Sequence, residues 1–335
     1  MEQAKLGTKK RLFSGIQPSG TLHIGNYFGA LQQWLEHQAE FDCVFSVVDY
    51  HALTSVKDAA LLRENTFNAF RDLLAIGIDP NKSILFQQSR VQEHPELAWI
   101  LDCLVPVSML ELGHAYKDKV AKGLDANAGL FNYPMLMAAD IILYDTDVVP
   151  VGADQRQHVE YAREAAAKFN LAYGKTFVEP KEMIVENVAI VPGTDGKKMS
   201  KSYGNTIPLF GSRDEIAKAV MSIVTDSTTT EDYSHVAFQK APLQTVRPAN
   251  LYMIHKLFKP DSILFPLYSA NQNNYKALKE ILIEDIDVFV APMREKWASI
   301  TDADVKRIVE EGSAKAKAIA SAKMADVRQK IGVTL

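Results

Sequence analysis

The chain has 335 residues, of which 47% are hydrophobic; this exceeds what one core usually holds, so we expect two domains. A formal net charge of −4 excludes a generally cationic body, so any contact with nucleic acid must come from local basic patches. Two cysteines are too few for a disulfide framework, and no stretch approaches the roughly 18 apolar residues of a membrane span. Together with a start that lacks an apolar leader, these features favour a soluble cytoplasmic protein.

Strands and helices alternate in the first part of the chain. Residues 11–16 predict a short strand, residues 24–37 have apolar side chains at helical spacing, and residues 43–49 form a buried-strand run. A second helix is predicted over residues 59–76, and residues 83–89 supply another strand. This alternation implies a parallel sheet, whose ligands bind at the carboxyl ends of its strands.

The remainder of the chain is predicted to be mainly helical. We therefore expect an α/β fold, with a Rossmann-type doubly wound parallel sheet and a second, all-helical domain. The first domain would span residues 1–205, with a helical insertion at about 93–145 and a lysine-rich loop. The second would span residues 206–335, and its last helices could pack back on the first domain.

The segment SGIQPSGTLHIGN, here called the glycine turn (residues 14–26), lies where the first strand should end and a helix begin. Thr21 is the expected helix N-cap, and the free N–H groups of the following turn would form an anion site suited to phosphate. Gly25 would allow a ligand or a backbone to come close, and His23 and Asn26 project from adjacent positions. A tight strand-to-helix turn without a ligand explains the glycines equally well.

A second unusual segment is KKMSKSYGN, here called the lysine loop (residues 197–205). Lys197, Lys198 and Lys201 lie close together beside small hydroxyl residues. Such a segment suits a mobile clamp that supplies positive charge to a polyphosphate during a displacement reaction. Composition alone favours a solvated basic loop.

HIGN at residues 23–26 and KMSKS at residues 198–202, in this order and at this separation, resemble the two signatures of the class I aminoacyl-tRNA synthetases. Longer segments resemble the tryptophanyl-tRNA synthetase family of that class, namely FSGIQPSGTLHIGNYFGAL, VDYHALT, GIDP, AGLFNYPMLMAADIILYDTDVVPVGADQRQHVE, KKMSKSYGNT and IVTDS. The resemblance is strong over the first two-thirds and loose beyond. It implies activation of tryptophan by Mg-bound ATP to an adenylate, followed by transfer of the aminoacyl group to tRNA(Trp).

The resemblance also implies roles for individual residues. The catalytic, phosphate-handling residues would be His23, Lys119, Lys198 and Lys201. The ATP site would further contain Gln17, Pro18, Ser19, Gly25, Asn26, Gly152, Ala153, Asp154, Ile190, Met199, Ser200 and Ser202. No protein side chain is expected to hold a metal ion, and catalysis would come from positioning and charge stabilisation.

The amino-acid pocket can be considered from the chemistry of indole. Its one polar group is an N–H that only donates, so a specific site needs one acceptor in an apolar slot. Asp140, on an otherwise apolar helix, is the expected acceptor, although a purely structural partner for it is an alternative. Phe13, Met137, Val149 and Val151 would wall the indole, and Tyr133 and Gln155 would hold the ammonium or carboxylate. For the four apolar residues, an ordinary core role is the commoner explanation.

Two positions depart from the family pattern. Asn26 replaces the second histidine of the general class I signature, a change that the tryptophan branch shares. The run Gly113-His114-Ala115-Tyr116 stands where the family often has Met-Thr-Gln-Phe, so a glutamine is missing at Ala115. How this turn orients substrate is therefore open.

Three other functions remain possible at this point. A tyrosyl-tRNA synthetase shares the fold, and phenol also donates a hydrogen bond. A small-molecule nucleotidylyltransferase would share the phosphate turn, and a non-catalytic tRNA-binding protein would keep the helices. The apolar helices near Trp99 and Leu104 suggest a homodimer surface, which the family also implies, although an internal core helix is the alternative.

Overall fold

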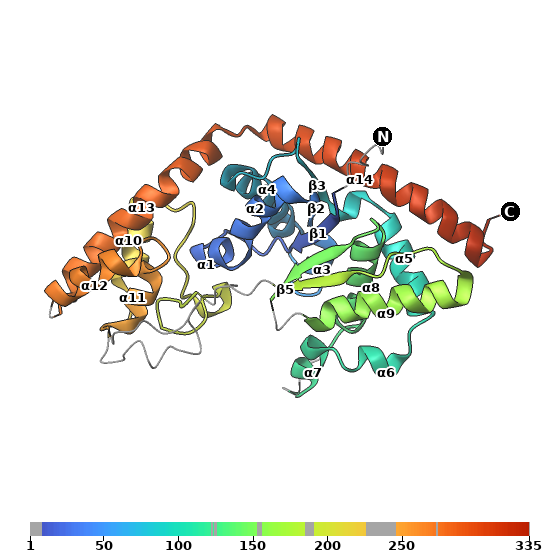
Figure 1. Cartoon of the computed structure of the whole chain (residues 1–335), viewed down its shortest axis with the longest axis horizontal. Coiled ribbons are helices and arrows are strands. Elements are labelled where there is room, and N and C mark those ends of the chain that lie inside the picture. The colour runs from blue at the N-terminus through green and yellow to red at the C-terminus, as the bar shows by residue number, and fades with distance from the viewer. Residues whose placement is uncertain are drawn as a thin grey trace, which may run out of the picture.

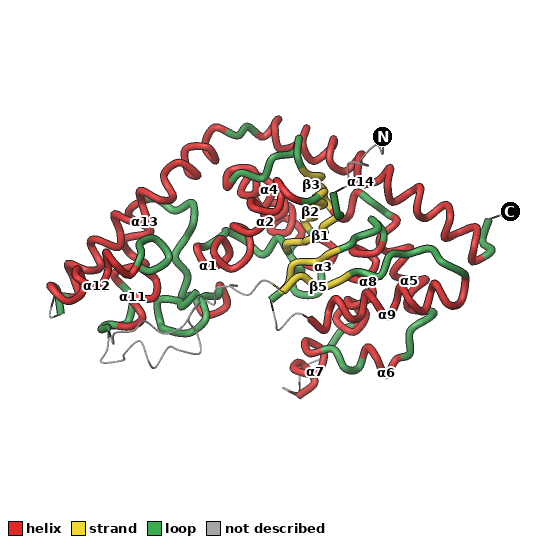
Figure 2. The backbone as a smooth tube through the Cα atoms, viewed as in Figure 1, coloured by secondary structure: helices red, strands yellow, loops and turns green. Residues whose placement is uncertain are grey.

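The computed structural model describes residues 9–121, 123, 126–152, 156–184, 191–225, 246–272 and 274–334. At its centre lies a five-stranded parallel sheet with strand order β3-β2-β1-β4-β5 (Figures 1 and 2). The strands are β1 (Arg11–Ile16), β2 (Asp42–Val47), β3 (Ser83–Gln87), β4 (Val148–Val151) and β5 (Lys181–Ile184). The order changes direction at β1, which creates a switch point where open α/β sheets bind ligands. The predicted Rossmann-type sheet is confirmed.

Helices connect these strands and continue beyond the sheet (Figure 1). The first set comprises α1 (Ile24–Asn26), a π-helical turn (Tyr27–Leu31), α2 (Gln32–Glu40), α3 (Asp49–Ala52), α4 (Ala59–Ile76), α5 (Glu93–Asp102), α6 (Val107–Leu110), α7 (His114–Ala121), α8 (Ala128–Ile142) and α9 (Arg156–Tyr173). The second set comprises α10 (Arg213–Met221), α11 (Ala249–His255), α12 (Asp261–Ala270), α13 (Tyr275–Ser299) and α14 (Asp302–Ile331). Short 3₁₀ turns occupy Gln88–Arg90 and Lys201–Tyr203.

Most predicted boundaries agree with the structure, and three are wrong in detail. Helix α4 has the predicted bounds, and Gly77 ends it with a left-handed φ of +118°, which favours glycine. The strands predicted over residues 43–49 and 83–89 each end two residues early, because the chain turns there into α3 or a 3₁₀ turn. The predicted cap Thr21 is also wrong, since α1 begins later, with His23 in the extended N-cap conformation.

Both faces of the sheet are buried, as expected when helices cover a parallel sheet on each side. Successive strand residues alternate between two hydrophobic clusters. Leu12, Phe45 and Leu85 point into one cluster with α4, whereas Phe13, Val44 and Phe86 point into the other with α5, α8 and α9. The sheet is therefore a rigid platform whose strand ends are fixed by packing on both sides.

The last long helix, α14, lies against the edge strand β3 (Figure 1). A Cβ added at Gly312 would lie 1.9 Å from the carbonyl oxygen of Leu85, so only glycine allows this approach. The neighbouring Ser313 hydroxyl accepts a hydrogen bond from the Gln87 N–H at 3.4 Å. Helix α14 thus covers a strand edge that would otherwise be open to pairing with another chain.

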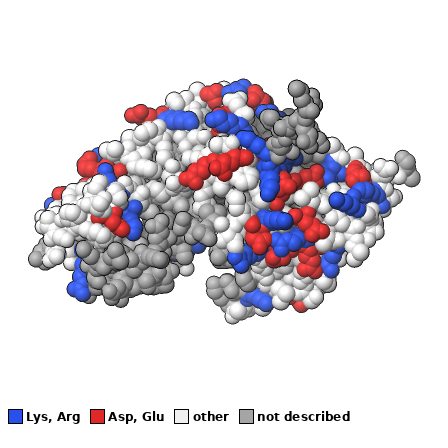
Figure 3. All heavy atoms as spheres, viewed as in Figure 1, with Lys and Arg blue, Asp and Glu red and all other residues white. Residues whose placement is uncertain are grey.

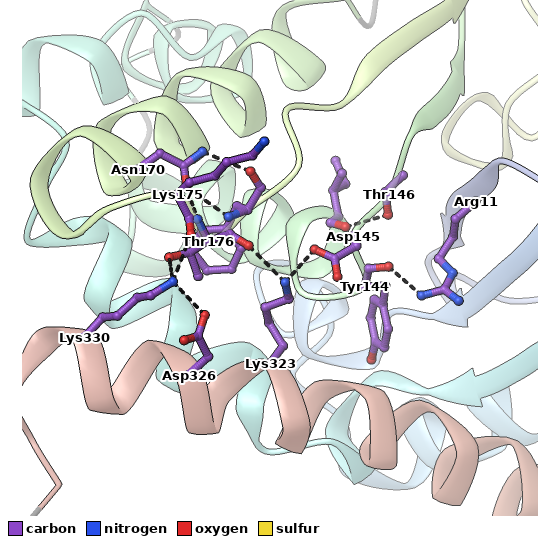
Figure 4. A network of polar contacts seen from close by, with 12 residues as sticks. Arg11, Tyr144, Asp145, Thr146, Asn170, Lys175, Thr176, Lys323, Asp326 and Lys330 are labelled. Carbon is purple, nitrogen blue, oxygen red and sulfur yellow. Dashed lines mark hydrogen bonds and ion pairs between the residues drawn. The ribbon is translucent and has the colours of Figure 1, made fainter.

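Polar contacts attach the C-terminal half of α14 to the connections before β4 and β5 (Figure 4). The Lys323 ammonium lies 2.6 Å from the Asp145 carboxylate and donates to the Thr176 carbonyl at 3.0 Å. Lys330 donates to the Thr176 hydroxyl at 2.8 Å. The last helix therefore contacts the sheet-bearing part, while the division into domains at residue 205 stays a prediction.

Helices α10 to α13 lie to one side of the sheet (Figure 1). Their apolar residues, such as Val220 and Ile286, belong to the same hydrophobic cluster as the α4 face of the sheet. An aromatic group joins the two parts: the Phe28 ring packs edge-to-face on Phe258 at 5.4 Å and stacks on Phe289 at the same distance. The helical part is therefore joined to the start of the first helix through apolar contact.

Candidate active site

A pocket of about 490 Å³ opens at the switch point, where β1 and β4 end. This volume lies within the usual range of small-molecule sites. The predicted site residues that line it are Phe13, Gln17, Tyr133, Met137, Asp140, Val149, Val151, Gly152 and Lys198. The sheet therefore brings together predicted residues from four separate segments of the chain around one pocket.

Asp140, on α8, is the charged group at the base of this pocket, and its side chain is 2% exposed. His51 Nε2 lies 2.8 Å from Oδ2, and His94 Nδ1 lies 2.6 Å from Oδ1. The Gln88 amide donates to both oxygens, at 2.7 and 2.9 Å. Burial alone would raise the pKa of Asp140, but the hydrogen bonds and charges of His51 and His94 outweigh it and lower the pKa to about 2.

A further hydrogen bond orients His94. Its Nδ1 lies 2.6 Å from Asp140 Oδ1, and its other nitrogen, Nε2, lies 2.7 Å from the oxygen that bears the Tyr144 hydroxyl proton. Burial, with the charge of Asp140 adding to it, holds the pKa of Tyr144 well above its ordinary value, so the phenol keeps this proton. The contacts with Asp140 and Tyr144 therefore fix the orientation of the His94 ring beside the carboxylate.

Each oxygen of Asp140 already has two protein donors, which fills the roughly four acceptor positions of a carboxylate. A ligand N–H could be accepted if it replaced one branch of the divided Gln88 bond, since the same amide would keep the other branch. The structural partners that the sequence left open for Asp140 are thus present, and its place in the pocket wall leaves room for a ligand as well.

His51, Gln88 and His94 were missed from the sequence. His51 follows the carboxyl end of β2, and Gln88 follows the carboxyl end of β3. A polar residue just after a buried strand was the available signal, because the ends of parallel strands share one edge of the sheet. His94 had no such signal, since its contact with Asp140 depends on how α5 packs on α8.

The pocket has an apolar wall and a polar side. Phe13 is buried and stacks on Tyr144, with ring centroids 5.9 Å apart. On the other side, the Tyr133 hydroxyl lies 3.0 Å from His158 Nε2, and burial raises the pKa of Tyr133. Gln155, predicted beside Tyr133, lies outside the described residues.

The glycine turn continues from β1 beside this pocket. The His23 N–H donates to the Asn26 side chain at 3.1 Å, which closes the first turn of α1. A Cβ at Gly25 would lie 2.9 Å from His23 Nδ1 and 3.2 Å from Met199 Cβ, so glycine is needed for the His23 ring to lie here. Burial, and secondarily the charge of Lys201, lower the pKa of His23 to about 4, so the ring is neutral near pH 7. Within the described part of the chain, its buried Nδ1 has no hydrogen-bond partner.

The lysine loop lies against the glycine turn. Lys201 Nζ donates to the Gly20 carbonyl at 2.7 Å and to the Ser19 carbonyl at 3.2 Å. Met199 is buried, while the Ser200 and Ser202 hydroxyls lie 2.9 Å apart in an exposed position. The loop cation therefore reaches the turn that was predicted to bind phosphate.

Asn205, at the end of the lysine loop, fixes the loop backbone and was not singled out from the sequence. Its buried side chain accepts from the Ser200 N–H at 2.8 Å and donates to the Lys198 carbonyl at 3.1 Å and to Asp195 at 2.6 Å. A Cβ at Gly193 would lie 2.3 Å from the Asn205 amide nitrogen. The absence of a side chain at Gly193 therefore leaves the space that the Asn205 side chain occupies.

Other predicted residues are placed apart or are not described. Lys119 lies on α7 and is not among the residues that line the pocket. Pro18 is buried within the glycine turn. The calls that fall outside the described residues are Ala153, Asp154, Gln155 and Ile190, and the side chains of His114 and Ala115 are also not described. Tyr116 of the departing run packs edge-to-face on Phe131, with centroids 4.9 Å apart.

The described ranges bear on the kind of site in two ways. They contain no group of three or more His, Cys, Asp or Glu side chains suited to a metal ion. Among those same residues, no helix combines the length and the apolarity needed to cross a bilayer.

Known proteins agree with this geometry. The family model of class I tRNA synthetases (W and Y) matches residues 5–285. The tryptophan–tRNA ligases of Fusobacterium nucleatum and Campylobacter jejuni are 46% and 44% identical, over 97% and 96% of this chain and 98% and 100% of theirs. The solved structure of tryptophanyl-tRNA synthetase from Campylobacter jejuni complexed with ADP and tryptophan is 43% identical and superposes with a TM-score of 0.85, covering 96% of this chain and 99% of that one. The chain belongs to the tryptophan–tRNA ligase family of the class I tRNA synthetases.

Proposed function

We propose that this chain activates L-tryptophan with ATP to tryptophanyl-adenylate and transfers the tryptophanyl group to tRNA(Trp). The single observation that carries the proposal is the pocket at the switch point, in which an ionised, buried Asp140 faces apolar walls beside Lys198. The family membership supports the same reaction and favours tryptophan over the tyrosyl alternative.

In the first step, a carboxylate oxygen of tryptophan forms a bond to the α-phosphorus of ATP while the bond to pyrophosphate breaks. Negative charge then moves onto the leaving pyrophosphate. Lys198 and Lys201 would neutralise that charge, and the neutral His23 ring would contribute a hydrogen bond rather than a cation. Because His23 Nδ1 is buried without a partner among the described residues, the turn has an unused polar atom for a phosphate oxygen.

The remaining ATP-site residues would position the nucleotide. Gln17, Pro18, Ser19, Gly25 and Asn26 belong to the glycine turn, and Met199, Ser200 and Ser202 to the lysine loop. Gly152, Ala153, Asp154 and Ile190 would hold the ribose and adenine, and Lys119 would reach the phosphates from α7. Mg²⁺ would enter with the phosphates of ATP as part of the substrate.

The tryptophan side chain would enter the apolar part of the pocket. Phe13, Met137, Val149 and Val151 would pack on the indole, and Asp140 would accept its N–H. Tyr133 and Gln155 would bind the ammonium or carboxylate. A phenylalanine side chain would offer no N–H to Asp140, so it would lose the one hydrogen bond that the indole makes to this carboxylate.

In the second step, a hydroxyl of the terminal tRNA ribose attacks the adenylate carbonyl, and AMP leaves. The helical part from residue 206 would read the anticodon, through phosphate contacts and base stacking. On the face shown in Figure 3, basic and acidic side chains are interspersed, so tRNA contact there would depend on local groups rather than on one basic surface.

We also propose an oligomeric state and a cellular location. Trp99 is 70% exposed and Val107 is 62% exposed, on α5 and α6, and this apolar surface supports a homodimer. A cytoplasmic location would give the enzyme access to tRNA and to the translation machinery.

The test is amino-acid-dependent exchange of labelled pyrophosphate into ATP, run in parallel with tryptophan, tyrosine and phenylalanine. We expect exchange with tryptophan alone, followed by charging of tRNA(Trp) when tRNA is added. Exchange with tyrosine instead would reassign the substrate, and exchange with none of the three would return the site to the nucleotidylyltransferase or binding-protein alternatives.

A further inference from the structure

A second buried carboxylate, Asp72 on α4, lies behind the glycine turn and has no part in the reaction described above. Its side chain is 4% exposed. It accepts a hydrogen bond from the Trp297 indole N–H at 2.8 Å. It also accepts from the backbone N–H of Leu22. A carboxylate is costly to bury, so its donors determine how it is held.

The Leu22 contact ties Asp72 to the start of α1. The Leu22 carbonyl accepts from the Leu209 N–H at 3.0 Å, and the Ile24 N–H donates to the Ile207 carbonyl at 3.0 Å. Residues 207–209 directly follow the lysine loop. The backbone that carries His23 is therefore held between Asp72 on one side and the end of the lysine loop on the other.

Asp72 also acts electrostatically on the lysine loop. Burial lowers the pKa of Lys201, and the negative charge of Asp72 opposes that lowering. In turn, burial raises the pKa of Asp72, and the positive charge of Lys201 opposes that rise. The other cation acting on Asp72 is Arg71, which forms an ion pair with Asp302. Asp72 is thus coupled to the cation that lies on the Ser19–Gly20 carbonyls.

The Trp297 contact ties the same carboxylate to α13. The Arg71 guanidinium lies 4.8 Å from the centre of the Trp297 ring, and the Phe210 ring lies 6.4 Å from it. Arg71 also covers Phe67 of its own helix at 5.3 Å. Trp297 therefore packs against both Arg71 and Phe210, and its N–H donates to Asp72.

We propose that Asp72 and Trp297 form a positioning pair that ties the glycine turn and Lys201 to helix α13. Because α13 also carries the packing of the helical part, displacement of that part would be transmitted through one carboxylate to the groups that handle the ATP phosphates. This inference rests on the proposed ATP site and adds a residue from the helical part to its control. The pair touches neither tryptophan nor ATP and acts through the turn and the loop.

The test uses two variants of the full chain in pyrophosphate exchange, with the active fraction measured by adenylate formation. Trp297→Phe removes the N–H but keeps a ring against Arg71 and Phe210. Asp72→Asn keeps the shape but loses the charge and one acceptor. We expect each to raise the KM for ATP by about tenfold, the size of one lost hydrogen bond to a charged group, while the KM for tryptophan changes by less than about twofold.

A matched control is Tyr252→Phe, which removes an aromatic donor from another carboxylate, Asp261, at 2.6 Å within the helical part. It should leave both KM values unchanged. A double variant sharpens the test, since Trp297→Phe should add little to the ATP effect of Lys201→Ala if both act on the same groups.

Three results would overturn the proposal: unchanged KM for ATP in both variants, an equal rise for both substrates, or the same ATP effect in Tyr252→Phe. Loss of thermal stability with unchanged KM values would likewise mean a structural role only. Absence of exchange in the unmodified protein would instead count against the proposed function, so the two failures are distinguishable.

Discussion

Asp140 and Asp72 are both buried on helices that pack against the central sheet, one on each face, and their pKa values move in opposite directions. Burial would raise both. At Asp140, the hydrogen bonds and charges of two histidines overcome burial and lower the pKa to about 2. At Asp72, one indole N–H, one backbone N–H and more remote cations do not, and the pKa rises to about 6. The comparison teaches that, for two carboxylates that are both buried, the number and charge of the donors decide whether the pKa is raised or lowered.

The largest effect is expected where the donors are most numerous. Asp140→Ala leaves His51, Gln88 and His94 without their shared acceptor and removes the proposed indole partner. We expect kcat/KM for tryptophan in pyrophosphate exchange to fall by about 10³-fold or more. Asp140→Asn is the control for shape, and it should retain more of the fold than the alanine variant. Near-normal exchange in Asp140→Ala would break the distinction between the two carboxylates.

A variant at the sheet edge should lose stability through a steric clash, without any change of charge. Gly312→Ala would place a Cβ 1.9 Å from the Leu85 carbonyl oxygen, so we expect a loss of roughly 3 kcal/mol of unfolding free energy in urea. Ser313→Ala, one residue on, removes only the acceptor of a 3.4 Å bond and should cost less than about 1 kcal/mol. Equal stability of the two variants would contradict the close approach of α14 to β3.

The pH dependence of stability should differ in sign between the two aspartates. The folded-state pKa of Asp140 is depressed, so its contribution is present above the unfolded pKa near 4 and is lost as the pH falls towards 2. The folded-state pKa of Asp72 is raised, so the folded form takes up the proton first and stability falls as the pH rises from about 4 to about 6. Each change should amount to roughly 2–3 kcal/mol.

Unfolding free energies of the unmodified protein, Asp140→Asn and Asp72→Asn, measured from about pH 2 to about pH 7, would resolve these two slopes. Asp72→Asn should reduce the decline between about pH 4 and pH 6 and leave the acid limb in place, while Asp102, whose pKa burial also raises to about 6, maintains part of the decline. Slopes of the same sign would mean that the donors do not set the two pKa values as described.

The smallest effect is expected at Tyr144, which is linked to Asp140 through His94. Tyr144→Phe leaves His94 Nε2 without its hydroxyl partner, while the bond from His94 to Asp140 can persist. We expect the KM for tryptophan to rise by about fivefold and the KM for ATP to stay unchanged, measured in the same exchange assay. An effect as large as that of Asp140→Ala would show that His94, rather than the carboxylate, dominates the site.

The sequence predicted the strand-helix alternation, the bounds of α4 and the turn after β1, because apolar periodicity and glycine placement are local properties. Its resemblance to known families also selected Asp140, which the structure places in the pocket wall. The partners of Asp140 could not be predicted in full, since His94 reaches it only through the packing of α5 on α8. Asp72 and Trp297 are 225 residues apart, and no local pattern connects them. The displaced helix start at His23 depended on pairing with residues 207–209, which is also long-range.

The most direct test of the central claim, that Asp140 selects tryptophan by accepting the indole N–H, uses a change in the ligand rather than in the protein. β-(3-Benzothienyl)alanine has nearly the shape of tryptophan but carries sulfur in place of the N–H. In pyrophosphate exchange with the unmodified protein, we predict that kcat/KM for this analogue is lower than that for tryptophan by about tenfold or more, because it offers Asp140 no N–H while the carboxylate keeps its protein donors. Equal values for the two compounds would contradict the account, since the pocket would then select shape and not the hydrogen bond.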